Sequence, residues 1–457
     1  MESITINKIL EITQGELFQG KTDLEISGVA IDSRTVKSGD LYIPIVGENN
    51  NGHAFIVKAF ENGGKVTLTQ ERQWEFPADM TVVFVTSTLE AMKSLAAFHR
   101  HRYQLPVIAI TGSSGKTTTK DLVAAVLSQK YNTLKTQGNF NNEYGIPQTL
   151  FHLKPEHEIA VIEMGMDHLG DITKSIHEVD PDIGVITNIG LTHVETLKTQ
   201  ENIFLAKKEI LQTLGTGNIA LVNGDDPFLV KLRDEAHTFA VKTFGIQGNH
   251  DLVIQDYSSH SQGLNLTVNW EDQQESYVFN YPGAHNLYNC MVAIWLGHYY
   301  HMTQMEIQKG LNAFVPSQNR MDIFQVGAMK VINDSYNANP DAMRGALDVL
   351  NTMKSDYIRS IAILGDMLEM GDHGPAAHFK TGEYAKTRAD VLIGVGPLGE
   401  EICKGYGSDQ GHVYHVPDAA AAGECIASIM TPGDIILIKG SRGMGLEKTI
   451  DYIKGEK

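Results

Sequence analysis

A glycine-rich turn with a strand before it and a helix after it constrains the fold of this chain most strongly. Residues 106–110 are apolar and rich in β-branched side chains, which predicts a buried strand. Apolar residues recur at helical spacing after Thr117, which predicts a helix. The turn between them, TGSSGKTT, directs backbone N–H groups, the positive end of a helix dipole and the Lys116 ammonium at one point. We therefore expect it to bind a phosphate chain, with the Thr117 hydroxyl on a bound Mg²⁺.

The turn departs in one place from the usual form of such phosphate-binding loops. Ile110 stands five residues before Gly115, where a glycine is usual. The alternative interpretation is a tight strand–helix turn with an exposed lysine. The order of strand, turn and helix favours phosphate binding, because that order is the structural context that the motif needs.

Length and composition exclude several classes of protein. The chain has 457 residues, more than one hydrophobic core usually organises, so two to four domains of about 100–200 residues are expected. Its formal charge of −18 argues against nucleic-acid binding, which needs a basic face. The three cysteines have no metal-binding or redox spacing, and no apolar run reaches the ~18 residues of a membrane span. The first residues lack the features of a signal peptide, so we expect a cytoplasmic protein.

Strand and turn patterns divide the chain into three parts. Residues 1–85 mix short strands with turns. Residues 86–316 alternate buried strands with helices, and an alternating stretch at 244–281 predicts an antiparallel appendage. Residues 317–457 follow a doubly wound pattern. The expected fold is α/β with three domains: a small α/β domain, a central P-loop ATPase-like domain with a mostly parallel sheet, and a C-terminal Rossmann-like domain.

Polar side chains at the carboxyl ends of predicted strands indicate a site near the turn. Glu163 ends one strand of the central part and is a candidate ligand of Mg²⁺. His193 follows another such strand, although a lone histidine is more often structural. Lys207 and Lys208 point about 100° apart on a predicted helix, so one of them can face the site while the other faces water.

Asparagine-rich and glycine-rich turns supply further candidates. The segment GNFNNEYG contains Asn139, Asn141 and Asn142, whose amides either bind a polar substrate or satisfy the turn. In the C-terminal part, INDSYNANP ends in a polar turn before a helix, and IKGSRGMG has the composition of an anion-binding turn. Together with Arg320, these turns predict a second polar rim that faces the phosphate-binding turn across a cleft.

Taken together, these motifs resemble the Mur ligases, the ATP-dependent amide-bond-forming enzymes of bacterial cell-wall precursor synthesis. Six segments of this chain are similar to motifs found across the whole family: TGSSGKTT, EMG, THVE, AKKE, GAHN and NRMD. Further segments resemble one branch of the family in particular, the branch that adds D-alanyl-D-alanine. They are GNFNNEYGIPQTL, EMGMDHLGDI, DSYNANP, GDMLEMG and KGSRGMGLE. The segment 32–55 resembles the UDP-sugar-recognition domain of several members, and the likeness extends over essentially the whole chain.

The resemblance implies roles for individual residues. On its terms, the phosphates of ATP are bound by Gly112, Ser113, Ser114, Gly115, Lys116, Thr117 and Thr118. The rest of the nucleotide is bound by Asn286, Asn289, Arg320 and Asp334. The implied metal ligands are Thr117, Glu163, His193 and Lys207, with a carbamate on Lys207. The implied catalytic residues are Lys116, Lys207 and His193, and the UDP part is contacted by Ser33 and Arg34.

The implied reaction joins D-alanyl-D-alanine to UDP-N-acetylmuramoyl-tripeptide through an acyl phosphate and releases ADP and phosphate. The partners are then small molecules, and the chain is expected to act as a monomer. Hinges near 85–105 and 315–320 let three domains close and keep water from the acyl phosphate. Asn337 and Asn339 are expected to position the dipeptide; the alternative interpretation is that they only shape the turn before Pro340.

Two other functions compete with this expectation. A ligase that adds glutamate to folate shares the phosphate-binding turn but should lack the UDP-recognition segment and DSYNANP. A nucleotide-binding regulatory protein that hydrolyses ATP as a switch should release phosphate when no carboxylate and amine are present. A ligase should not.

Overall fold

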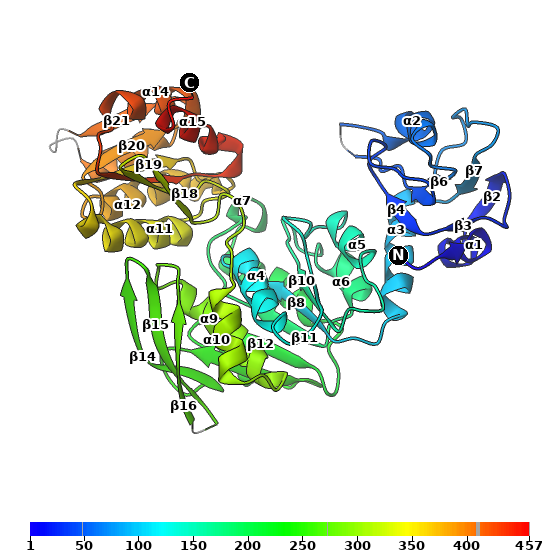
Figure 1. The fold of residues 1–457 in the computed structure, drawn as a ribbon, viewed down its shortest axis with the longest axis horizontal. Helices are drawn as coiled ribbons and strands as arrows, with labels where there is room; N and C mark the ends of the chain where they lie inside the picture. Colours follow the sequence, from blue (N-terminus) through cyan, green and yellow to red (C-terminus); the bar gives the residue numbers. More distant parts are fainter. Residues whose placement is uncertain (48, 272, 408–411, 457) are drawn as a thin grey trace.

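Three large β-sheets follow one another along the chain and form three parts of the molecule (Figure 1). The computed structural model describes residues 1–47, 49–271, 273–407 and 412–456. The blue N-terminal part and the orange to red C-terminal part lie at opposite ends of the view, with the central part between them. None of the helices in these ranges is long and apolar enough to cross a membrane.

The N-terminal part is a five-stranded sheet in the order β2-β7-β6-β5-β4, in which only β2 runs antiparallel to its neighbour. Its strands are β2 (Glu16–Gln19), β4 (Gly28–Ala30), β5 (Asp40–Tyr42), β6 (Val66–Thr69) and β7 (Thr81–Phe84). A short ladder and two helices complete it: β1 (Ile4–Thr5), β3 (Glu25–Ile26), α1 (Ile6–Thr13) and α2 (Ile56–Glu61). The strands are short because turn-forming segments interrupt the sequence, as predicted.

Helix α3 (Thr88–His101) connects the N-terminal part to the central part. Ser87 begins it, since its hydroxyl accepts a hydrogen bond from the backbone N–H of Glu90. The buried face of α3, including Met92 and Leu95, packs against α1 on one side and against α5 (Gly145–Leu150) and α6 (Thr173–Val179) on the other. One apolar cluster therefore runs through both parts.

The central part is a nine-stranded sheet in the order β16-β15-β14-β13-β12-β11-β8-β10-β9. Its parallel strands are β8 (Val107–Thr111), β9 (Thr133–Lys135), β10 (Ile159–Glu163), β11 (Ile183–Ile186), β12 (Ile219–Asn223) and β13 (Ala240–Gly245). The antiparallel appendage is β14 (Leu252–His260), β15 (Gly263–Trp270) and β16 (Gln273–Phe279). Strands β8, β10, β11 and β12 are buried throughout, which explains why they read as continuous apolar runs.

Helices cover both faces of this sheet. One face packs against α4 (Lys116–Leu127), α9 (Asn286–Tyr299) and α10 (Gln304–Asn312). The other packs against α3, α5, α6 and α8 (Gln200–Lys208), with α7 (Val194–Leu197) in the preceding loop. Helix α10 begins with a capping box, in which the hydroxyl of Thr303 and the carboxylate of Glu306 accept hydrogen bonds from each other's backbone N–H.

The C-terminal part is a six-stranded sheet in the order β17-β18-β22-β19-β20-β21, in which only β17 is antiparallel. Its strands are β17 (Asp322–Val326), β18 (Met329–Asp334), β19 (Arg359–Gly365), β20 (Val391–Val395), β21 (Val413–Val416) and β22 (Asp434–Lys439). One face carries α11 (Pro340–Met353), α12 (Gly374–Ala385) and α13 (Gly399–Tyr406). The other carries α14 (Ala419–Ile429) and α15 (Thr449–Ile453).

The predicted α/β class with three parts and mostly parallel sheets is confirmed. The domain limits 1–85, 86–316 and 317–457 stay a prediction. Helix α3 illustrates why such a limit is hard to fix, because its apolar face packs on elements from both sides of residue 85.

Candidate active site

One large cavity, of about 1290 Å³, is lined by residues from all three parts. Ile31 and Ile45 contribute from the N-terminal part. The predicted site residues that line it are Ser113, Ser114, Gly115, Lys116, Thr117, Thr118, Asn141, Asn142, Glu163, His193, Asn286, Asn289, Arg320, Asp334, Asn337 and Asn339. Because the carboxyl ends of β8 and β10 meet β18 and β22 here, side chains far apart in the sequence share one space.

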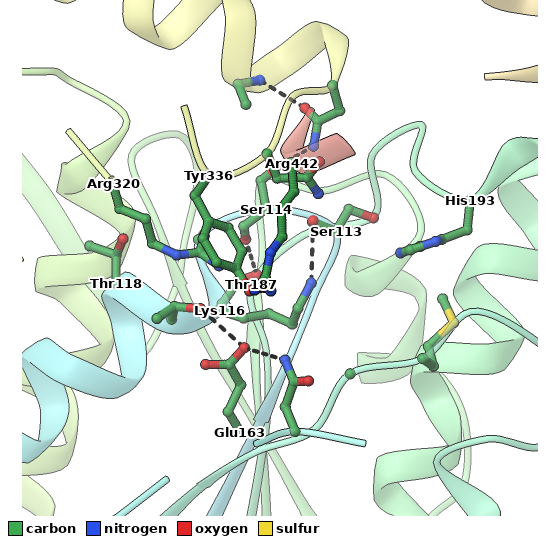
Figure 2. A pocket seen from close by; sticks show the side chains of 18 of the residues that line it. Ser113, Ser114, Lys116, Thr118, Glu163, Thr187, His193, Arg320, Tyr336 and Arg442 are labelled. Atoms are coloured by element: carbon green, nitrogen blue, oxygen red, sulfur yellow. Dashed lines mark hydrogen bonds between the residues drawn. The ribbon is translucent and has the colours of Figure 1, made fainter. Parts of the chain in front are cut away.

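The glycine-rich turn adopts the conformation that its sequence demands. Gly115 has a φ of +80°, and a Cβ there would lie 2.8 Å from the side-chain oxygen of Asn289. Helix α4 begins at Lys116, so its first N–H groups face the cavity. The Lys116 ammonium donates to the carbonyl of Gly112 at 2.6 Å and, at 3.4 Å, to that of Ser113 (Figure 2). Burial lowers the pKa of Lys116, and the Arg320 guanidinium adds to the effect while Glu163 opposes it.

Glu163 lies beside this turn with one carboxylate oxygen free. The Thr117 hydroxyl donates to its Oε1 at 3.1 Å and the Asn141 amide donates to the same atom at 2.7 Å (Figure 2). Its Oε2 is buried and accepts no hydrogen bond, and the Lys120 ammonium is 4.0 Å away. A hydroxyl next to a carboxylate oxygen without a partner fits the oxygen ligands that Mg²⁺ prefers. Within the described ranges, no group of three or more His, Cys, Asp and Glu side chains is arranged to hold a metal.

His193 joins the central part to the C-terminal part. Its backbone has a φ of 54°, and its Nδ1 lies 2.8 Å from Oε2 of Glu369 and 3.3 Å from Oδ1 of Asp167. The backbone N–H of Glu195 also donates to the carbonyl of Glu369 at 3.1 Å. The hydrogen bond from His193 lowers the pKa of Glu369. The ring is thus fixed through Nδ1 by two carboxylates.

The two neighbouring lysines of α8 have opposite environments, as the helical spacing predicts. Lys207 is 1% exposed, whereas Lys208 is at the surface and pairs with Glu235. Burial lowers the pKa of Lys207 well below its usual range, and the Lys116 charge adds to this while Asp167 opposes it. Burial of this kind favours the neutral, nucleophilic form of a lysine.

The C-terminal rim is tied together by Lys439. Its ammonium binds the Asp334 carboxylate and the carbonyl of Asn337, the latter at 2.9 Å. Asn339 begins α11, since its Oδ1 accepts the N–H of Ala342 at 2.8 Å. Its Nδ2 donates to the hydroxyl of Ser114 at 2.9 Å, which connects the rim directly to the glycine-rich turn.

Comparison with known proteins agrees with this architecture. The Mur ligase middle domain matches residues 110–297, the Mur ligase glutamate ligase domain matches 319–442, and the Mur ligase family catalytic domain matches 25–100. The UDP-N-acetylmuramoyl-tripeptide–D-alanyl-D-alanine ligase of Bacillus subtilis is 34% identical over 98% of this chain and 97% of its own length. The chain belongs to the Mur ligase family.

Solved structures give the same result for this Mur ligase. A crystal structure of MurF from Acinetobacter baumannii superposes with a TM-score of 0.91 at 29% identity, covering 100% of both chains. The structure of MurF ligase from Thermotoga maritima in complex with ADP superposes with a TM-score of 0.82 at 25% identity, covering 94% of this chain and 97% of that one.

Several residues predicted for the site of this Mur ligase lie outside the main cavity. Gly112 and Lys207 lie behind its lining, and Asn139 lines a smaller neighbouring cleft. Ser33 is buried, with its carbonyl bound by the Asn62 side chain. Arg34 is exposed and pairs with Asp32 at 2.6 Å.

The predicted nucleotide residues Asn286 and Asn289 lie beneath a set of aromatic side chains. The amide of Asn289 donates to Oδ1 of Asn286 at 3.0 Å, and its own oxygen accepts the Thr119 hydroxyl at the same distance. The cavity wall beside them is formed by Phe244, Tyr281, His285, Tyr288 and Phe314. The sequence analysis missed these rings, which give the cavity a flat, largely apolar wall.

Tyr336 and Glu369 are further residues that the sequence analysis missed. The Arg320 guanidinium lies 3.8 Å and that of Arg442 5.4 Å from the centre of the Tyr336 ring, above Lys116 in Figure 2. Tyr336 belongs to the DSYNANP motif, so the motif itself could have identified it as a candidate site residue. Glu369 stands inside GDMLEMG in the same way.

Proposed function

We propose that this Mur ligase joins D-alanyl-D-alanine to UDP-N-acetylmuramoyl-tripeptide with ATP, giving the pentapeptide precursor of peptidoglycan, ADP and phosphate. One observation carries the proposal: a phosphate-binding turn, a polar C-terminal rim and residues of the N-terminal part, among them Ile31, Ile45 and Asn49, line a single cavity. The proteins that the chain resembles over its whole length bear the name of this activity.

The nucleotide has a complete set of partners in this cavity. The N–H groups of the glycine-rich turn and of α4 bind the phosphates, with Lys116 on the β/γ side. Asn286, Asn289 and the aromatic wall receive the adenine, while Arg320 and Asp334 meet ribose and phosphate from the C-terminal rim. A relative from Thermotoga maritima was crystallised with ADP, which supports a nucleotide here.

The chain's own residues account for the acyl-transfer chemistry. A carboxylate is a poor acylating agent, so the peptide carboxylate takes the γ-phosphoryl group and becomes an acyl phosphate. Lys116 and the turn N–H groups stabilise the charge on that phosphoryl group during transfer. The ammonium of the dipeptide first gives a proton to solvent, and the neutral amine then attacks the acyl carbon. Phosphate leaves from the tetrahedral intermediate together with the proton that the new amide nitrogen loses. Two contacts join the central part to the C-terminal part and so help to exclude water from the cavity. They are His193 with Glu369 and Ser114 with Asn339.

Thr117, Glu163, His193 and Lys207 are proposed to hold Mg²⁺ around the phosphates. When bound, the metal neutralises charge on the transferring group. The free oxygen of Glu163 supports this role. Lys207 is proposed to carry a carbamate, because a buried neutral amine reacts with CO₂ and the product supplies oxygen ligands in place of a cation.

The substrates are assigned to the remaining polar groups. Asn141 and Asn142 line the cavity on the side of the N-terminal part and are proposed, with Asn139, to contact the UDP-linked peptide. Ser33 and Arg34 are proposed for its UDP end, and Asn337 and Asn339 for the dipeptide. With nucleotide substrates, the enzyme is proposed to act in the cytoplasm, as a monomer of three domains at 1–85, 86–316 and 317–457.

Phosphate release measured with ATP, UDP-N-acetylmuramoyl-tripeptide and a panel of D-amino acids and dipeptides tests the proposal. We expect release only when the tripeptide and D-alanyl-D-alanine are both present. Release with ATP alone would instead indicate a nucleotide switch. Turnover with a folate and glutamate, but not with the UDP-tripeptide, would indicate the other ligase class.

A further inference from the structure

A second, smaller cleft of about 350 Å³ lies on the other side of the Arg320–Tyr336–Arg442 group. It is shared by the central part and the C-terminal part. Its lining residues are Thr117, Gly138, Asn139, Ser317, Gln318, Asn319, Arg320, Ser335, Tyr336, Arg442 and Glu447. Thr117 also lines the main cavity, so the cleft opens beside the phosphate-binding turn.

Three charged side chains of both signs line this cleft, and none of them has an ion-pair partner among the described residues. Arg320 contacts only the face of the Tyr336 ring. Arg442 makes a long contact of 3.5 Å with the Tyr336 hydroxyl. Glu447 is half-buried, and its carboxylate makes no hydrogen bond with the described part of the chain. Elsewhere in the structure, charged groups of this kind are commonly paired, as Arg359 and Lys439 are.

The backbone holds these charges in place without a ligand. Arg442 begins a short 3-10 turn (Arg442–Met444) and Glu447 lies in the next one (Leu446–Lys448). Between them, Gly445 has a φ of +61°, and the fully buried Leu446 anchors the segment beneath β19 and β22. Arg320 is held against the Tyr336 ring from the hinge side. The cleft thus presents two cations and one anion, none of them paired with an opposite charge among the described residues.

We propose that this cleft binds the incoming dipeptide as a zwitterion, with its carboxylate on Arg442 and its ammonium on Glu447, while Arg320 remains with the nucleotide. This assignment rests on the proposed function and names residues for its amine substrate. A dipeptide carries opposite charges at its two ends, about 7 Å apart when extended. The Arg442 guanidinium suits the carboxylate, and the Glu447 carboxylate suits the ammonium.

The neutral groups of the cleft and its charge distinguish it from a phosphate site. Gln318 and Asn319 line it and can hydrogen-bond the peptide group of a dipeptide. Glu447 would repel a nucleotide phosphate, so this cleft is unsuited to a second ATP. The position beside Thr117 brings the amine to the side of the turn where the acyl phosphate forms.

Steady-state kinetics of Glu447→Gln test this assignment. We expect the KM for D-alanyl-D-alanine to rise about tenfold or more, with the KM values for ATP and the UDP-tripeptide within about twofold of the wild type. Arg442→Gln is expected to give the same pattern. Glu424→Gln, an exposed change on α14 far from the cleft, is the matched control and should leave all three constants unchanged.

Ligands that lack one charge separate the two ends. D-Lactoyl-D-alanine has no ammonium, so its inhibition constant should be the same for Glu447→Gln and the wild type but should weaken for Arg442→Gln. A dipeptide reduced to its alcohol has no carboxylate and should show the opposite pattern. Thermal unfolding of both variants near the wild-type temperature would exclude misfolding as the cause.

The two levels of the assignment fail in different ways. If the wild type ligates D-alanyl-D-alanine but both variants keep its KM unchanged, the cleft is not the dipeptide site and the proposed function stands. If the wild type does not ligate the dipeptide at all, the proposed function is wrong and this assignment falls with it.

Discussion

The two walls of the active-site cavity differ in how their polar groups are paired before any ligand binds. On the central wall, Lys116 is bonded within its own loop, and Thr117 and Asn141 both donate to Glu163. On the C-terminal wall, Arg320 and Arg442 share one tyrosine ring and have no carboxylate partner among the described residues. The first wall pairs its polar groups internally except for Oε2 of Glu163, whereas the second leaves the charges of Arg320 and Arg442 without an ion-pair partner among the described residues.

This difference suits the chemistry that we propose for each wall. Phosphoryl transfer benefits from donors fixed in advance, because they need no reorganisation at the moment of reaction. The C-terminal wall gains its charge partners only when anionic ligands arrive, so ligand binding favours closure of that part. The hinge carries a physical link between the walls: the Ser317 hydroxyl donates to Asp121, and Lys120 lies 3.1 Å from Asp121 and 4.0 Å from Glu163.

The largest expected effect is on the central wall. Lys116→Ala should reduce kcat by about a thousandfold or more, because it removes the charge that meets the transferring phosphoryl group. The secondary structure measured by circular dichroism should be unchanged, since β8 and α4 are held by their apolar faces. The exposed Lys154→Ala is the control and should turn over normally. Near-normal ligation by Lys116→Ala would mean that the loop does not act on phosphate.

The lysine pair of α8 gives the second test, with its control next to it in the sequence. Lys207→Ala should lower kcat by about a hundredfold, the usual cost of weakening a metal site, and short carboxylic acids should restore part of the activity. Lys208→Ala removes only a surface pair with Glu235 and should be mild. Mass spectrometry under native conditions should detect the CO₂ adduct in the wild type and in Lys208→Ala but not in Lys207→Ala. Equal, mild effects of the two changes would contradict the carbamate.

The central wall was predictable because its signals are local. A strand, a turn and a helix in sequence determine where Lys116 lies, and a strand end determines where Glu163 lies. The angle between adjacent helical positions was enough to predict that one of Lys207 and Lys208 is buried. In each case the prediction depends only on a few residues that are adjacent in the sequence.

The C-terminal wall was less predictable, because its contacts depend on how the parts are arranged. The stacking of Arg320 on Tyr336 joins residues on either side of a hairpin, and the pairing of His193 with Glu369 joins two separate sheets. The spacing of residues within one helix or strand carries no information about contacts between separate elements. Ser33 and Arg34 illustrate the same limit, since the sequence motif around them gave no information about their distance from the cavity.

The DSYNANP turn gives a test whose expected effect is of intermediate size, because its two asparagines, Asn337 and Asn339, differ in their hydrogen bonds. Nδ2 of Asn337 donates to no described residue, whereas Asn339 binds both Ala342 and Ser114. Asn337→Ala should raise the KM for D-alanyl-D-alanine severalfold, more than that for ATP or the UDP-tripeptide. Asn339→Ala should instead lower the stability by about 1 kcal/mol, the usual cost of losing a helix cap. If Asn337→Ala changes only the unfolding temperature, the turn is a scaffold.

The smallest expected effect concerns a carboxyl group that is buried away from the cavity walls. Burial raises the pKa of Glu178 to about 8, although Lys93 on α3 opposes the shift. Glu178 therefore keeps its proton when the chain is folded. The folded chain therefore binds one proton more than the unfolded chain between the ordinary pKa of 4.5 and about 8. Stability should fall as the pH rises through this window, by at most about 1.4 kcal/mol per pH unit.

Glu178→Gln keeps the shape of this side chain and removes its titration, so it isolates the effect. The unfolding temperature of the variant, minus that of the wild type, should be near zero at pH 4.5 and should increase by a few degrees up to pH 8. Glu424→Gln, in which an exposed carboxylate is changed, should show no such trend. The groups facing Glu178 are Lys93, Glu90 and Glu143, and the two carboxylates favour its protonated form. A temperature difference that is the same at every pH would mean that Glu178 is charged in the folded protein. The fold would then hold a buried carboxylate, one of whose oxygens has no hydrogen-bond partner, in its charged form.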